Sequence, residues 1–425
     1  MLEKRIDTLN ACIFYSMLIY PLCVTVRKVS LFDLVGKTAL LVMLFSLLIL
    51  FCLKKQYKSS WLMLALVAVM HVVEFANPIS PKESITTYLM YAVWVLFFLY
   101  LLNNYESFFD AASMRKRSIE AAVILWEVII AISAVFPSSY EHTWGEGTYF
   151  ISFSNTSFEL APAASLIFAL IVFCFVCDGN AKKATMLSVV PIICSFASGS
   201  RTYLVVIGLE AFVLAMMVFK SKTALFAFVT VALVACVSLL GMTNIGAKFA
   251  NAFQYSSDQG AFWSVFTSGR DAFWAADIRA YFDGNILNQL FGYGFSFVYE
   301  VNETAFGNRI YAHNDFINIL LTFGCVGLIP YLYAFGRCFA VLGHQMKRGF
   351  VWPIMGIWLF NAVFNMAYVY MSATFGLGLL MVAAAHFCRT SANQPISDSA
   401  TGETKEDNLA FGRRGTTKLH YLGRI

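Results

Sequence analysis

The sequence predicts an all-α, polytopic membrane protein with about twelve transmembrane helices. Hydrophobic residues make up 59% of the 425-residue chain and charged residues only 13%, and the mean hydropathy is +0.68. A soluble domain, by comparison, carries about 25% charged residues. Apolar runs long enough to cross a bilayer recur along the whole chain, and lysines and arginines concentrate in alternate connecting segments, as in cytoplasmic loops.

Helix-length apolar segments, taken in chain order, define the predicted spans. The first is not expected to be a cleaved signal peptide, because it lacks a small-residue cleavage site and another span follows at once. The predicted spans cover residues 9–26, 34–53, 60–76, 88–102, 119–136, 159–177, 184–198, 202–219, 223–241, 314–336, 351–369 and 371–388.

The basic residues predict the orientation. If the N-terminus lies inside, 21 of the 30 lysines and arginines fall in inner segments and nine fall outside. A missing span would invert every later segment and remove this asymmetry, so the asymmetry supports the span count. We therefore expect both termini in the cytoplasm and the longest connecting segment, residues 242–313, on the outer side.

The chain divides into two predicted regions. Residues 1–388 form the transmembrane domain, including the loop 242–313, and the polar residues 389–425 predict a disordered cytoplasmic tail. Within the loop, residues 274–282 have helical spacing and the glycines of residues 291–294 indicate a turn. Because a structureless loop of this length is unusual, we expect short amphipathic helices on the outer face.

Several functional classes lack support in the sequence. There is no phosphate-binding loop and no dinucleotide fingerprint, so neither a cofactor nor nucleotide-driven transport is expected. All ten cysteines lie in or beside apolar runs, and the C-x-x-C spacing of Cys174 and Cys177 lacks the βαβ context of a redox motif. His313 and Asp315 do not form a metal-binding pair, so no metal is expected. The net charge of +5 fits cytoplasmic loops and does not indicate a nucleic-acid partner.

The arginines on the outer side are the first candidate site residues. Arg201 lies in a very short turn between two spans, so its guanidinium must lie at the outer membrane boundary, where it matches phosphate oxygens through paired donors. Arg270, Arg279 and Arg309 lie in the outer loop and are candidates to bind the same ligand as Arg201, a diphosphate. Two alternatives stay open: Arg201 could bind lipid headgroups, and Arg270 could form a salt bridge with Asp271.

The segment Arg309–Leu328 places a polar cluster directly before a span. An unperturbed histidine pKa near 6.5 suits general-base catalysis, so His313 is a candidate catalytic residue. Asn314 and Asp315 are candidate substrate-binding residues, although Asn314 could instead cap the following helix. His313 could likewise be only a capping or hydrogen-bonding residue. Gly324 and Gly327 are expected to let another helix approach closely.

Polar side chains inside the spans leave a second class of function open. Glu127 and Glu210 are expected to face the bundle interior, and they keep a transporter of lipid-linked sugar as an alternative. They are sparse, whereas the candidate arginines gather on one outer face, which favours a transferase. Asn361 and Asn365, one helical turn apart, are expected to join helices through hydrogen bonds.

Five motifs follow one another along the chain. They are G-T-Y-F-I-S-F-S-N-T-S-F-E-L-A at 147–161, S-G-S-R-T-Y-L at 198–204, S-G-R-D-A-F-W at 268–274, L-F-G-Y-G at 290–294 and A-H-N-D-F-I-N-I-L-L-T-F-G-C-V-G-L at 312–328. Together they resemble the O-antigen polymerase (Wzy-type) and O-antigen ligase superfamily. The resemblance implies a glycosyltransferase C-like helical fold and transfer of undecaprenyl-diphosphate-linked glycan on the periplasmic face of the bacterial inner membrane. It assigns the family's catalytic positions to Arg201, Arg270 and His313, and it adds Tyr293 as a substrate-binding candidate.

The resemblance implies a metal-independent membrane glycosyltransferase that polymerises lipid-linked oligosaccharide repeat units for lipopolysaccharide or a related surface polysaccharide. The single histidine of A-H-N-D differs from the H-x-H-N form of some ligases, which favours a polymerase over an O-antigen ligase acting on lipid A-core. The implied partners are undecaprenyl-diphosphate-linked oligosaccharide and membrane lipids, with a chain-length regulator and a flippase as candidate protein partners.

Overall fold

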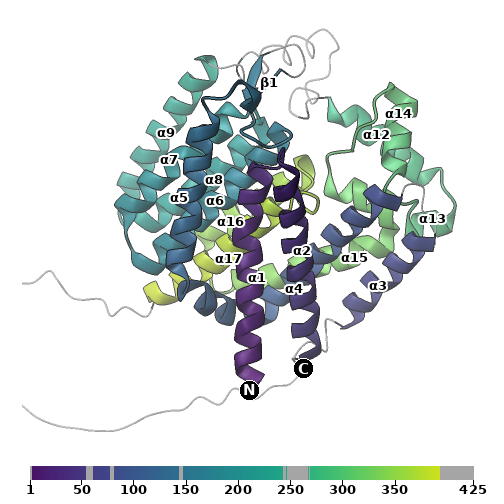
Figure 1. Cartoon of the computed structure of the whole chain (residues 1–425), viewed down its shortest axis with the longest axis horizontal. Helices are drawn as coiled ribbons and strands as arrows, with labels where there is room; N and C mark the ends of the chain where they lie inside the picture. The colour runs from purple at the N-terminus through teal and green to yellow at the C-terminus, as the bar shows by residue number, and fades with distance from the viewer. Residues whose placement is uncertain are drawn as a thin grey trace, which may run out of the picture.

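The protein is a polytopic helical membrane protein. The computed structural model describes residues 2–53, 61–76, 81–142, 147–242 and 269–392, together with residues 246 and 267. Across these residues the chain folds into fifteen α-helices, a short 3-10 helix (Pro137–Ser139) and one two-stranded hairpin (Figure 1). Seven of the described helices are long and apolar enough to cross a membrane.

Each predicted span coincides with one described helix. Five of these helices, α3, α5, α7, α9 and α16, are not among the seven that are long and apolar enough to cross a membrane, so the number of crossings remains a prediction. The twelve helices are α1 (Leu2–Thr25), α2 (Ser30–Leu53), α3 (Trp61–Ala76), α4 (Pro81–Ser113), α5 (Lys116–Ser133), α6 (Ser157–Asp178), α7 (Ala181–Ala197), α8 (Arg201–Val218), α9 (Lys222–Met242), α15 (Asp315–Gly343), α16 (Arg348–Phe364) and α17 (Met371–Ala392).

The centre of the bundle is built from α6, α17 and the middle of α4. Apolar residues occupy every face of α6, and all of its side chains from Leu160 to Phe175 are buried, as expected for a helix surrounded by other helices. Close packing depends on small residues in α17. A Cβ added at Gly378 would lie 2.5 Å from the ring of Phe97 on α4, so only glycine fits there.

The described part of the outer loop forms three short helices, which lie together on one side of the bundle in Figure 1. They are α12 (Arg270–Phe282), α13 (Ile286–Phe291) and α14 (Phe297–Phe306). The predicted helix at residues 274–282 is therefore confirmed, as is the turn at residues 291–294, where Gly292 and Gly294 both have positive φ. Most of residues 243–266 lies outside the described residues.

A break in α15 attaches these loop helices to the membrane domain. Gly324 leaves the helical conformation at φ 67° and ψ −168°, which frees carbonyl groups of the preceding turn. The N–H groups of Tyr293 and Gly294 donate to the oxygens of Leu321 and Thr322, at 2.7 and 3.2 Å. A Cβ added at Gly324 would lie 2.3 Å from the carbonyl oxygen of Leu290 on α13. The expected close approach of another helix at Gly324 is thus confirmed.

A small hairpin departs from a purely helical fold. Strands β1 (Tyr140–His142) and β2 (Thr148–Phe150) pair in antiparallel register. The buried ring of Tyr149 lies against Gly199, where an added Cβ would approach it to 2.2 Å. The hairpin therefore covers the turn that leads into α8.

The two ends of the domain are described to different extents. The N-terminus lies at the opposite end of the bundle from the hairpin (Figure 1). At the other terminus α17 continues to Ala392, so residues 389–392 are helical. The rest of the predicted tail lies outside the described residues, and its disorder stays a prediction.

Candidate functional site

Two of the predicted arginines are the first residues of helices. Arg201 begins α8 and Arg270 begins α12, and each follows a glycine-containing turn in which Gly199 or Gly269 has positive φ. Neither N-cap residue, Ser200 or Gly269, bonds to its helix through a side chain. Because a helix N-terminus carries a partial positive charge, each arginine adds to a region that already favours anions.

The C-terminal end of α16 connects these two helix starts. Arg270 donates from Nη1 to the carbonyl oxygen of Phe364, and its neighbour Asp271 accepts a 2.6 Å hydrogen bond from Thr267. Thr202, next to Arg201, donates to Oδ1 of Asn365 at 2.5 Å. Asn365 also donates to Oδ1 of Asn361 at 3.1 Å, within the same helix end. Asn365 therefore joins α16 to α8 through Thr202, whereas its bond with Asn361 stays inside α16.

The positive charges act on one another. Burial and the charge of Arg201 lower the pKa of Arg270 to about 10. Two like charges held close together in a partly buried position destabilise each other. A bound anion would relieve this cost, so the pair is suited to a ligand with several negative charges.

His313 lies beside this pair. Its backbone has a positive φ of 52°, which is uncommon for a residue with a side chain. Its ring lies near those of Phe158 and Tyr311, with centroid distances of 6.0 and 6.3 Å. Burial and the charge of Arg270 lower the pKa of His313 to about 3, so the imidazole is neutral at physiological pH. The preceding Ala312 is held to α12, because its carbonyl oxygen accepts a 2.6 Å hydrogen bond from the Trp274 indole.

Asn314 and Asp315, next in sequence, have partners inside the protein. Oδ1 of Asn314 accepts from the backbone N–H of Ile317 at 3.2 Å, so this side chain caps α15. Asp315 is fully buried and accepts a 2.6 Å hydrogen bond from Tyr331. These contacts support the capping alternative for Asn314. The substrate-binding roles of both residues stay predictions.

The structure gives Tyr293, Arg279 and Arg309 other surroundings. The Tyr293 ring stacks on Phe297 with centroids 4.0 Å apart, and its hydroxyl donates weakly to the Ala280 carbonyl oxygen at 3.4 Å. Arg279 and Arg309 are exposed. Arg309 lies 3.3 Å from Glu303, and its guanidinium lies over the Tyr299 ring. Among the eight predicted site residues, the structure therefore brings Arg201, Arg270 and His313 together.

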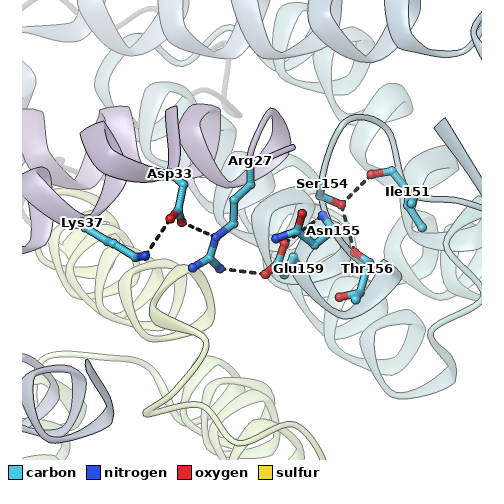
Figure 2. A network of polar contacts seen from close by, with 8 residues as sticks. All are labelled: Arg27, Asp33, Lys37, Ile151, Ser154, Asn155, Thr156 and Glu159. Atoms are coloured by element: carbon cyan, nitrogen blue, oxygen red, sulfur yellow. Dashed lines mark hydrogen bonds and ion pairs between the residues drawn. The ribbon is translucent and has the colours of Figure 1, made fainter. Parts of the chain in front are cut away.

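A second polar cluster was not predicted from the sequence as a site. Figure 2 shows its ion pairs: Arg27, after α1, pairs with Asp33 at 2.5 Å and with Glu159 of α6 at 2.7 Å. Lys37 pairs with the other oxygen of Asp33 at 2.6 Å. Glu159 also accepts from the backbone N–H of Asn155 at 3.0 Å. We call these four charged residues the ion-pair network. The one signal for it in the sequence was the predicted outward position of Arg27 and Lys37, two of the nine basic residues expected outside.

Comparison with known proteins adds one family match. Residues 186–332 match the family model described as O-antigen ligase. The matched segment runs from α7 into α15 and includes Arg201, Arg270 and His313, whereas the ion-pair network lies outside it. A comparison with curated proteins gave no match.

Proposed function

We propose, on the premise that residues 186–332 belong to the O-antigen ligase and polymerase superfamily, that this glycan-transferring membrane protein is a polymerase of lipid-linked repeat units. The donor is an oligosaccharide on undecaprenyl diphosphate, and the acceptor is the non-reducing sugar of a second lipid-linked unit. The reaction takes place on the periplasmic face of the bacterial inner membrane, where the positive-inside rule puts the outer loop.

The observation that carries the proposal is the convergence of Arg201 and Arg270 at two helix N-termini. Both groups would hold the diphosphate, whose charge grows as it leaves. An acceptor hydroxyl oxygen forms a bond to the anomeric carbon of the donor sugar as the bond from that carbon to the diphosphate oxygen breaks. The diphosphate takes the bonding electrons, and preorganised positive groups stabilise the charge that develops.

His313 would accept the proton of the attacking hydroxyl. A pKa of about 3 makes the free imidazole a weak base, because catalytic efficiency is greatest when the pKa lies near the working pH. A bound diphosphate would offset the charge of Arg270, the smaller of the two causes of the low pKa, and so raise the pKa of His313. Donor binding would therefore activate the base, and the donor would bind before transfer begins.

An O-antigen ligase is the second candidate, favoured by the description of the matching family. A deletion strain separates the two functions. If the protein is a polymerase, lipopolysaccharide or capsule from the deletion strain carries a single repeat unit where the parent strain carries a ladder. Loss of all attached units, with polymer accumulating on the lipid carrier, would identify a ligase, and an unchanged ladder would reject both functions.

A further inference from the structure

A cavity of about 370 Å³ lies next to the candidate site. Its volume is within the range of small-molecule sites, which run from about 300 to 1,000 Å³. It lies among the end of α1, the starts of α4, α6 and α17, and the segment before α15. Charged, hydroxyl and aromatic groups line it, among them Arg27, Glu159, Thr86, Ser372, Tyr311 and Tyr370.

The charged groups along the cavity wall compensate one another. Arg27 and Lys37 line the cavity, and they pair with the two carboxylates of the ion-pair network, Asp33 and Glu159. An anionic ligand would have to compete with these carboxylates and would lie close to Glu159. Burial raises the pKa of Tyr370, so its phenol stays neutral and can donate a hydrogen bond. Such a wall favours an uncharged ligand rich in hydroxyl groups.

The charged groups are also held in place before any ligand arrives. Arg27 holds one carboxylate oxygen of Glu159 and the Asn155 N–H holds the other (Figure 2). Hydrogen bonds to ionised groups are stronger than those between neutral groups. A fixed guanidinium and carboxylate could therefore donate to and accept from neighbouring hydroxyls with little loss of conformational entropy on binding.

The cavity shares walls with the His313 region. Tyr311 lines the cavity, and its ring is 6.3 Å from that of His313. Phe158, whose ring centroid is 6.0 Å from that of His313, directly precedes Glu159. Tyr370 lines the cavity and interacts electrostatically with Arg270. A sugar in the cavity would thus lie next to both the base and the diphosphate site.

We propose that this cavity is the acceptor site and binds an uncharged sugar ring, with Arg27 and Glu159 bonding to its hydroxyls and Tyr311 packing against its face. The proposal rests on the function proposed above. It assigns specificity to α1, α4 and α6, which lie outside the segment that matches the family.

Binding to the purified full-length protein in lipid nanodiscs tests the assignment with two labelled probes. The probes are undecaprenyl diphosphate and the strain's own repeat-unit oligosaccharide, released from its carrier. Thr86→Val removes one wall hydroxyl at nearly constant shape and should weaken oligosaccharide binding about three- to tenfold, the value of one hydrogen bond. Thr86→Phe should fill the cavity and abolish it. Both variants should bind undecaprenyl diphosphate within about twofold of wild type, since the arginine pair is unchanged.

The matched control is Thr230→Val on α9, where an exposed hydroxyl bonds only to its own helix and both affinities should be unchanged. An oligosaccharide whose acceptor sugar is a hexuronic acid should bind at least about tenfold more weakly, because its carboxylate meets Glu159. An equal loss of affinity for both probes in the Thr86 variants would place the cavity in the donor site. Unchanged oligosaccharide binding in Thr86→Phe, or tighter binding of the acidic probe, would also overturn the proposal. Failure of the proposed function would appear separately, as normal polymer in an Arg201→Ala strain.

Discussion

Two clusters of basic side chains lie next to each other in this protein, and they differ in what surrounds their charge. In the ion-pair network, Arg27 pairs with Asp33 and Glu159. Burial opposes its charge, but these carboxylates raise the pKa of Arg27 overall. At the other cluster, burial and a second cation, Arg201, lower the pKa of Arg270. The fold therefore stabilises the charged form of the arginine side chain at Arg27 and destabilises it at Arg270.

This difference indicates what each cluster can bind. A compensated network gains little from an incoming anion, because the anion must displace a carboxylate that is already present. Two arginines that repel each other gain most from a ligand that brings negative charge. We therefore expect the diphosphate at Arg201 and Arg270, which we call the α8–α12 pair, and the uncharged sugar beside the ion-pair network.

The largest expected effect comes from removing either arginine of the α8–α12 pair. Arg201→Ala and Arg270→Ala should each abolish polymer while leaving the protein's abundance in the membrane near the wild-type level. Arg→Lys should restore little activity, because a point charge does not reproduce the paired donors of guanidinium. The measurement is the polysaccharide ladder together with immunoblots of membrane fractions.

Three other arginines serve as comparisons. Arg337 is exposed on α15 and its alanine variant should be fully active. Arg279 and Arg309 are also exposed, so their alanine variants should lose much less activity than Arg270→Ala if position decides function. Equal loss in all four outer-side arginine variants would instead support a diphosphate site that includes the exposed residues. Full activity of Arg201→Ala or Arg270→Ala would remove that arginine from the mechanism.

The next largest effect concerns His313 and how its charge depends on the donor. His313→Ala should slow transfer about 100-fold or more, as expected for loss of a general base. With a pKa of about 3, free His313 is already deprotonated above about pH 4, so it should add no acidic limb to kcat/KM between pH 5 and 8. Bound diphosphate should raise this pKa, so the acidic limb of kcat should lie at higher pH than that of kcat/KM.

An in vitro assay with purified lipid-linked repeat units gives both profiles. Donor binding should survive in His313→Ala, because both arginines remain. Near-normal turnover by His313→Gln would mean that the imidazole only forms hydrogen bonds, and coincident limbs for kcat and kcat/KM would mean that the donor does not change its pKa.

Much of the fold could be predicted because hydropathy and periodicity are local properties of the sequence. The helices at the predicted spans and the helix α12 were predicted from such local patterns. The pairing of Arg27 with Glu159 could not be predicted, since it joins residues 132 positions apart. The same holds for the contact of Tyr149 with Gly199, which positions the turn before Arg201.

The site was predicted in part for a related reason. Arg270 and Arg279 both lie on α12, but nine residues correspond to about two and a half turns, so the two side chains point to opposite sides. The sequence predicted that both lie in the outer loop, but not which side of α12 faces Arg201. The low pKa of His313 likewise depends on burial by the folded chain and on Arg270, which is distant in sequence.

A moderate effect is expected from Asp277, which lies on α12, the helix that begins at Arg270. Its carboxylate is fully buried, and burial raises its pKa from 3.8 to about 7, although the Asn302 amide opposes the shift. The folded state therefore holds a proton that the unfolded state loses. Stability should be greatest below about pH 4 and should fall as the pH rises to about 7, by at most roughly 4 kcal/mol.

Thermal unfolding in detergent checks this dependence. Asp277→Asn should raise Tm at pH 8 and make little difference near pH 4, because the amide resembles the protonated acid. Asp277→Asn also tests whether substitutions on α12 reduce activity through instability, because it should leave both arginines in place. A lower Tm for Asp277→Asn at pH 8 would mean that the carboxylate is stabilised by its surroundings, contrary to the raised pKa.

The smallest effect is expected at Asn314, where capping and substrate binding make opposite predictions. Its side chain accepts from Ile317 N–H at the start of α15. Asn314→Ala should therefore lower the free energy of unfolding by about 1 kcal/mol, and Asn314→Asp, which keeps the acceptor oxygen, should change it little. If Asn314 only caps α15, KM for both substrates should stay near wild type in the Asp variant, even though its neighbour is His313, the proposed base. A raised KM in both variants, with Tm unchanged, would show that the amide contacts substrate and would extend the site from the α8–α12 pair to the first turn of α15.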